Sequence, residues 1–110
     1  MIENTIGEIE AKISGADSVS PAHKQELLAL LATLKTEVAG LSRTNSEAAD
    51  SIAGFARLSA QEAIRSQPDA TLRELSLKGL SSSAGGFEQT HPKLVQIVNN
   101  ITKTLSDLGI

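Results

Sequence analysis

The sequence predicts an all-α fold, a small bundle of four or five helices that forms a single domain over residues 1–110. Apolar residues recur at steps of three and four along most of the chain, the spacing that places side chains on one face of a helix. Only two residues are aromatic, so the core must be built from Leu, Ile, Val and Ala, which suits helix packing. A chain of this length buries roughly 65% of its unfolded surface, enough for a modest core.

The first predicted helix, residues 2–14, carries a narrow seam of isoleucines and is stopped by Gly15. A seam of this kind requires a partner helix to cover it. Its members are Ile2, Ile6, Ile9 and Ile13.

The second predicted helix spans residues 21–41. Ser20 is a favourable N-cap, and Pro21 fits the first helical position because its missing N–H would be unpaired there. Leu28 and Leu30 broaden its apolar stripe. The stripe consists of Leu27, Leu31, Leu34, Val38 and Leu41.

The third predicted helix spans residues 44–66. Residues 40–46, around its start, include Gly, Ser, Thr and Asn, which are weak helix formers. Thr44 and Glu47 form a capping box that would start it. We expect Asn45 to lie in a loop; the alternative is a polar residue that sets the register of a coiled coil. The stripe expected on this stretch consists of Asn45, Ala48, Ile52 and Phe55.

An alternative to two helices is one long, coiled-coil-like middle helix. The apolar stripe keeps its phase across the weak segment, so residues 21–66 could form a single helix. Such a helix would be about 70 Å long, and a second chain would be needed to cover it.

The fourth predicted helix, residues 69–88, follows a break at Pro68 and is capped by Asp69. Its end is rich in Ser, Ala and Gly, which by themselves indicate a loop, because an interior Gly costs about 1 kcal/mol relative to Ala. The apolar spacing nevertheless continues, so we expect a helix with a small-residue face that a neighbour approaches closely and a last turn that frays. The stripe consists of Arg73, Leu77, Leu80, Ala84 and Phe87.

The last predicted helix, residues 92–108, begins at Pro92, with His91 or Thr90 as its cap. Gly109 can adopt the left-handed conformation just past the helix, which would let Ile110 fold back onto Leu105. The stripe consists of Leu94, Val98, Ile101, Leu105 and Leu108.

The segment from Phe87 to Ile110 resembles the signature of a bacterial family of short helical proteins known only as a domain of unknown function. Members of that family carry a Phe-Glu, a small residue and His-Pro, and end close to Leu-Gly-Ile or Met-Gly-Ile. The resemblance also covers the Leu-rich helix after Pro21 more loosely, whereas residues 42–68 are longer than in the shortest members. It implies a bacterial source and a helix leading into the Phe-Glu, and it offers no activity. We treat the following residues as a structural signature: Phe87, Glu88, His91, Pro92, Leu105, Gly109 and Ile110.

Composition and charge argue against several function classes. The absence of cysteine excludes disulfides, zinc–thiolate sites and cysteine catalysis. The net charge of −3 arises in residues 1–20 and no basic stripe follows, so we expect no nucleic-acid partner. No apolar run approaches the roughly 18 residues of a membrane span, and the first residues lack signal-peptide features. We therefore expect a cytoplasmic protein without a membrane partner.

Glu88 and His91 form a Glu-x-x-His, the spacing that places two ligands on one helical face in di-iron carboxylate bundles. Those sites need the motif twice and two further carboxylates, and here it occurs once. Pro92 also pushes His91 out of helical conformation. We therefore expect no metal, cofactor or catalytic residue, and interpret Glu88 and His91 as turn residues that bond to nearby backbone.

Two further features lack the partners that chemistry requires. His23 is not paired by any pattern with a nucleophile and an acid. Residues 81–86 are as flexible as a phosphate-binding loop but lack its Gly-Lys-Ser/Thr ending.

The sequence thus predicts a non-enzymatic structural or protein-interaction module. The alternative is a metal-binding or metal-dependent bundle centred on Glu88 and His91. We expect a homo-oligomer, with another protein as a second kind of partner, because the seams offer more apolar surface than one small bundle covers.

Overall fold

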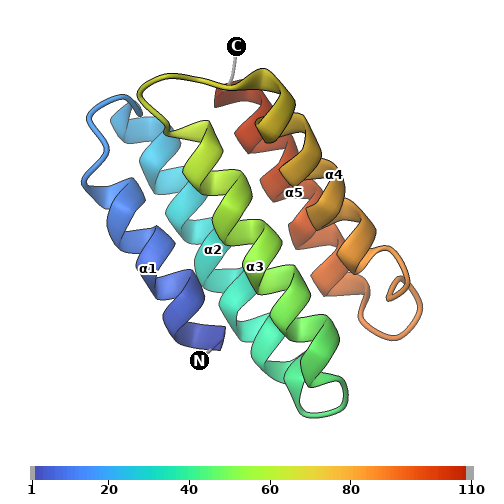
Figure 1. Cartoon of the computed structure of the whole chain (residues 1–110). Helices are drawn as coiled ribbons and strands as arrows, with labels where there is room; N and C mark the ends of the chain where they lie inside the picture. Colours follow the sequence, from blue (N-terminus) through green and yellow to red (C-terminus); the bar gives the residue numbers. More distant parts are fainter. Residues whose placement is uncertain (1, 109–110) are drawn as a thin grey trace.

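The structure, a computed structural model, describes residues 2–108. Within this range the chain forms five helices: α1 (Ile2–Ser14), α2 (Pro21–Ser42), α3 (Ser46–Ala63), α4 (Ala70–Ala84) and α5 (Pro92–Leu108). The described residues contain no strand, so the predicted all-α class is confirmed. Successive helices run in opposite directions along the long axis of the molecule (Figure 1).

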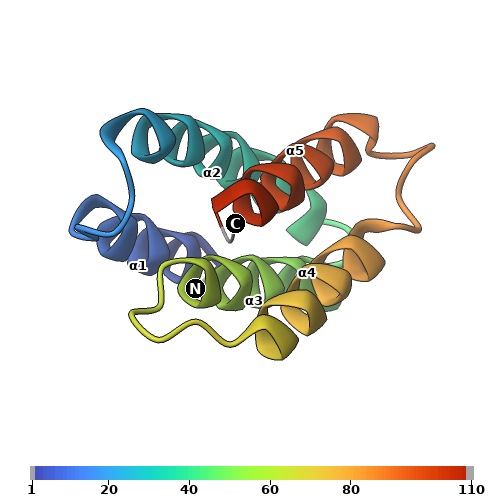
Figure 2. The same ribbon diagram turned by 90° about the horizontal axis from the view of Figure 1, so that it is seen from above.

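The helices lie in two layers (Figure 2). One layer contains α2 and α5, and the other contains α1, α3 and α4. Among the described residues, α3 packs against each of the other four helices, whereas α1 packs only on α2 and α3. The helix α3 is therefore central, and only its outward face is left for solvent.

The predicted stripes of α1, α2 and α5 form most of the core. The residues Ile6, Ile9 and Ile13 of α1 and the whole α2 stripe are buried, whereas the Ile2 side chain lies outside the described part. In α5 the first four stripe residues are buried and Leu108 is half-buried. The predicted Gly109 stop and the contact of Ile110 with Leu105 fall beyond residue 108, outside what the structure describes.

The predicted caps Ser20 and Asp69 and the predicted start of α5 at Pro92 are confirmed. Ser20 caps α2 by accepting a hydrogen bond from the His23 backbone N–H at 3.3 Å. Asp69 caps α4 in the same way, with its Oδ1 3.1 Å from the Leu72 nitrogen. Side-chain acceptors at these positions satisfy N–H groups that have no partner within the helix.

The break between α2 and α3 is confirmed, and the single long helix is wrong, but the predicted cap is wrong too. Asn45 caps α3, accepting at Oδ1 a hydrogen bond of 3.0 Å from the Ala48 nitrogen. The Thr44 hydroxyl instead donates to the Leu41 carbonyl oxygen at 3.2 Å, so Thr44 bonds back to the last turn of α2 from the loop that follows it. The helix that follows also ends earlier than predicted, at Ala63.

The buried face of α3 differs from the predicted stripe. Ile52 is buried as expected, but Ala48 is half-buried and Phe55 is 36% exposed. Because four helices surround α3, small side chains face them and let their backbones approach. The buried hydrophobic residues of α3 are Ala49, Ile52, Ala53, Ala56 and Ala60.

The helix α4 ends at Ala84, one turn before the predicted end, so Phe87 lies in the following turn. Gly85 and Gly86 follow directly, and the Phe87 nitrogen donates to the Ala84 carbonyl oxygen at 3.1 Å. The Ser- and Gly-rich end therefore follows its local preference for a turn.

The small-residue face predicted for α4 is confirmed where α4 meets α3. A Cβ atom on Gly79 would overlap the ring of Phe55, so the missing side chain is what admits the ring. Ser59 and Ser76 are buried, and each hydroxyl donates to a carbonyl oxygen of its own helix, at 2.7 and 2.9 Å. This bonding lets polar side chains lie between helices without an unsatisfied donor.

Candidate interaction surface

The predicted signature residues Phe87 to Pro92 form a closed turn between α4 and α5. The His91 nitrogen donates to the Phe87 carbonyl oxygen at 2.8 Å, and the His91 carbonyl oxygen accepts from the Val95 nitrogen at 3.3 Å. The bond from Val95 is the first backbone hydrogen bond of helix α5, so the His91 backbone caps the start of α5.

The His91 side chain contacts its own turn. Its ring lies edge-on to the ring of Phe87, with centroids 5.8 Å apart and planes at 83°. Its Nδ1 lies 3.1 Å from the Thr90 hydroxyl, so the bond goes to a side chain where a backbone partner was expected. Phe87 is half-buried against the core, and His91 therefore helps to fix the turn.

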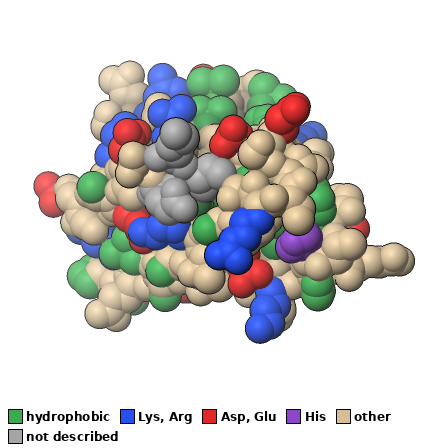
Figure 3. Space-filling model, turned by 90° about the horizontal axis from the view of Figure 1, so that it is seen from below, with side chains coloured by type: hydrophobic (Ala, Val, Ile, Leu, Met, Phe, Trp, Pro, Cys, Tyr) green, Lys and Arg blue, Asp and Glu red, His purple; other side chains and the backbone are tan. Residues whose placement is uncertain are grey.

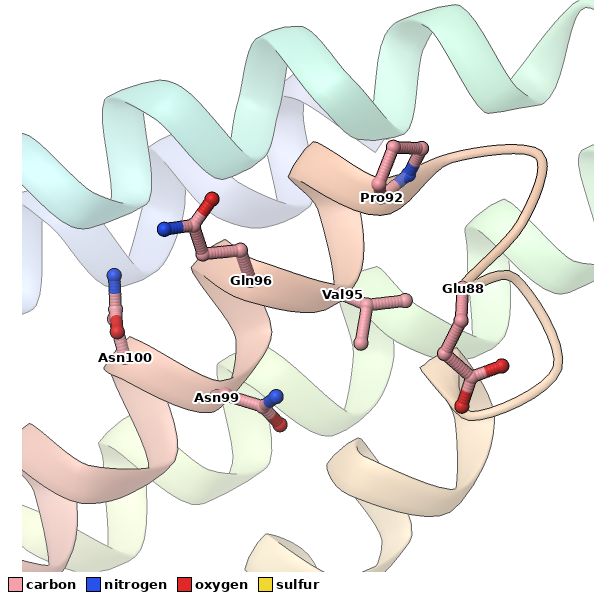
Figure 4. A pocket seen from close by; sticks show the side chains of 6 residues that line it. All are labelled: Glu88, Pro92, Val95, Gln96, Asn99 and Asn100. Carbon is pink, nitrogen blue, oxygen red and sulfur yellow. The ribbon is translucent and has the colours of Figure 1, made fainter.

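Glu88 lies exposed on the surface near the start of α5 (Figure 4). Within the described residues, no group of three or more His, Asp or Glu side chains lies close enough to hold a metal ion. Glu88 and His91 are therefore not joined there by the further carboxylates that a di-iron site requires.

A depression of about 410 Å³ lies over the outer side of α5. Figure 4 shows its lining side chains, which are Glu88, Pro92, Val95, Gln96, Asn99 and Asn100. Glu88 is the only ionisable member of this lining. The depression offers amide hydrogen bonds but not the paired groups that acid–base catalysis uses.

A second feature is a set of four large hydrophobic side chains exposed on α3 and α4. We call Phe55, Leu58, Leu72 and Leu75 the α3–α4 strip. Their exposed fractions are 36%, 42%, 43% and 59%, so Leu75 is the most open of them. Single exposed leucines are ordinary, whereas adjacent ones indicate a binding surface.

The four residues lie on α3 and α4, which form an antiparallel pair (Figure 1). Phe55 covers Gly79, and this contact sets the register between the helices. By helix geometry this register puts Leu58, one turn further along α3, at the level of Leu75, one turn earlier on α4. Leu72 continues the same face of α4, three residues before Leu75.

A hollow of about 300 Å³ borders the strip on α3. Apart from its own helix backbone and its chain neighbours, nothing stands within 4 Å of the place where a Cβ of Gly54 would lie, so this part of the surface is open. The lining consists of Asp50, Ser51, Gly54, Phe55 and Leu58.

The exposed charges along α3 differ between its two halves. Glu47 and Asp50 lie near its start, and Arg57 lies past its middle. Glu62, only 6% exposed, is paired with Arg65 at 2.9 Å, so the acidic charge of the second half is neutralised. The face of the molecule seen from below in Figure 3 shows acidic and basic side chains interspersed.

Sequence reasoning missed Leu58, Leu72 and Leu75, because they lie off the stripes expected to face the core. The available signal was their spacing: Leu58 follows Phe55 by three residues, and Leu75 follows Leu72 by three. Large apolar residues at such steps outside the main stripe indicate a second apolar face.

Residues 24–110 match the model of a family described as a domain of unknown function (DUF4404). The resemblance seen from Phe87 to Ile110 is thereby confirmed, and the match also includes the whole α3–α4 strip, whereas α1 precedes it. Comparisons with curated proteins and with solved structures find no match. None of the described helices is long and apolar enough to cross a membrane.

Proposed function

We propose that this chain, which belongs to the DUF4404 family of domains of unknown function, is a non-enzymatic helical module that binds a protein chain through the α3–α4 strip. The observation that supports this function is the exposure of four large apolar side chains, Phe55, Leu58, Leu72 and Leu75, on two helices that pack against each other. A cytoplasmic location is part of the same proposal.

The α3–α4 strip exposes apolar surface to water. Burying apolar surface is favourable by about 25 cal/mol per Å², so covering four large side chains drives association. Leucine pairs at steps of three also match the way in which one helix lies against another. The partner surface should therefore be an apolar helical face.

Site-specific photo-cross-linking tests the proposal. A photoreactive amino acid at Leu75 should give discrete protein adducts in cells that produce the protein natively. The matched control carries the same amino acid at Asn99, an exposed residue of the other layer, and should give none.

A further control removes part of the strip while the cross-linker stays at position 75. The substitution Leu72→Ser should abolish the adducts without loss of helix content, since Leu72 is already 43% exposed. Equal adduct formation at positions 75 and 99, or none at 75, would refute the proposed surface.

A further inference from the structure

We propose that the chain bound at the α3–α4 strip is a second copy of this protein, with the two α3 helices antiparallel across a two-fold axis near Gly54. The inference rests on the proposed function and names its partner. In such an isologous dimer the same surface of each copy must be complementary to itself.

The charges beside the strip meet this requirement. Asp50 and Arg57 are both exposed, and they are seven residues apart, close to two turns, which places them on one side of α3. Gly54 lies between them. A two-fold axis near Gly54 therefore brings Asp50 opposite the partner's Arg57, and Arg57 opposite the partner's Asp50.

The shape of the surface is self-complementary as well. The same axis brings the partner's Leu58, the residue after its Arg57, to the level of Ser51, which lines the hollow of about 300 Å³. Gly54 leaves that hollow open, since nothing stands within 4 Å of its missing Cβ. Leu58 of each copy thus fills the hollow of the other, and Phe55 and Leu75 extend the apolar contact.

A parallel arrangement, by contrast, would place like charges together. Asp50 would lie beside the partner's Asp50, and Arg57 beside the partner's Arg57. Like charges brought together across an interface are strongly unfavourable. The distribution of charge along α3 therefore favours the antiparallel dimer.

Charge exchange at positions 50 and 57, read by sedimentation velocity at low ionic strength, tests the proposal. The wild-type chain should dimerise. The variants Asp50→Arg and Arg57→Asp should each weaken the dimer by about tenfold or more, because each creates two like-charge pairs across the axis. Both residues are exposed, so circular dichroism should show unchanged helix content.

Two recombinations should restore association. The double variant Asp50→Arg with Arg57→Asp recreates both opposite-charge pairs. An equimolar mixture of the two single variants also recreates them, since one chain then carries arginine at both positions and the other carries aspartate at both. In the mixed dimer each arginine therefore lies opposite an aspartate.

A wild-type chain that stays monomeric from micromolar concentration upward would overturn this inference. If position 75 still cross-linked to a different protein, the proposed function would nevertheless stand. A dimer that is indifferent to the single variants, or that the double variant does not restore, would overturn the antiparallel α3 pairing.

Discussion

Leu105 and His91 belong to the same terminal segment but lie in different environments. Leu105 is fully buried in the fourth position of the α5 stripe. His91 is half-buried, and its ring contacts Phe87 and Thr90, both within its own turn. The first residue fills the space between helices, whereas the second fixes a local turn.

The substitution Leu105→Ala should therefore destabilise the fold far more than His91→Ala. Truncating a buried leucine costs about 2–5 kcal/mol, because apolar contacts are lost and a cavity remains. The loss of one aromatic contact and one exposed hydrogen bond costs about 1 kcal/mol. Urea melts followed by circular dichroism give both values, since the chain has no Trp or Tyr for fluorescence.

A larger loss of unfolding free energy in His91→Ala than in Leu105→Ala would contradict this account. It would mean that the histidine supports more of the fold than its own turn. The metal-binding alternative at Glu88 and His91 would then require a new test, by thermal melts with added iron, manganese or zinc.

At the scale of the element, the pair α3–α4 depends on one close approach. The ring of Phe55 occupies the space that a side chain at Gly79 would fill, and Ser59 and Ser76 are buried nearby in the same pair. The exposed α3–α4 strip and the close contact of Phe55 with Gly79 thus both result from the way in which α3 packs on α4.

Gly79→Ala should stabilise the protein less than Gly40→Ala does, or destabilise it. Both changes replace a glycine within a helix by alanine, which improves helix propensity by up to about 1 kcal/mol. A Cβ at Gly40 meets nothing within 4 Å, whereas a Cβ at Gly79 must displace the Phe55 ring. Denaturant melts of the two variants measure the difference.

The same comparison in a Phe55→Ala background isolates the contact. There Gly79→Ala should become stabilising, because the ring that it would displace is gone. An identical effect of Gly79→Ala in both backgrounds would show that the two residues are not in contact.

The helix α1 lies before the family match but is part of the packed core. Ile6, Ile9 and Ile13 are fully buried, and Glu10 pairs with Lys35 of α2 at 2.8 Å. The partly exposed ion pair contributes at most about 1 kcal/mol, so the isoleucines supply most of the attachment.

Most helix positions were predictable because local signals mark them. Ser20, Asp69 and Pro92 start helices through capping and proline geometry, which depend on neighbours in the sequence. The buried face of α3 was not predictable in this way, because it depends on α3 being central. Phe55 was therefore expected inside and lies at the surface.

At the scale of the whole molecule, the sequence indicated a bundle but not which helix occupies its centre. The candidate surface depends on that arrangement, since the strip consists of the apolar residues of α3 and α4 that remain exposed after packing. The resemblance instead directed attention to Glu88 and His91, whose turn the structure explains by packing. Self-association was expected from the isoleucine and leucine seams, whose members Ile6, Ile9 and Ile13 on α1, and Leu27, Leu31, Leu34 and Leu41 on α2, are buried within one chain.

Cysteine cross-linking at the proposed axis tests the antiparallel dimer directly. The chain contains no cysteine, so a single Gly54→Cys introduces one thiol per copy. An axis near Gly54 brings the two thiols together, and a disulfide forms only when the Cβ atoms approach to about 4 Å. We predict rapid formation of a covalent dimer under mild oxidation for Gly54→Cys, and little for the control Asn99→Cys. Equal rates for the two variants, or no covalent dimer from Gly54→Cys, would contradict it.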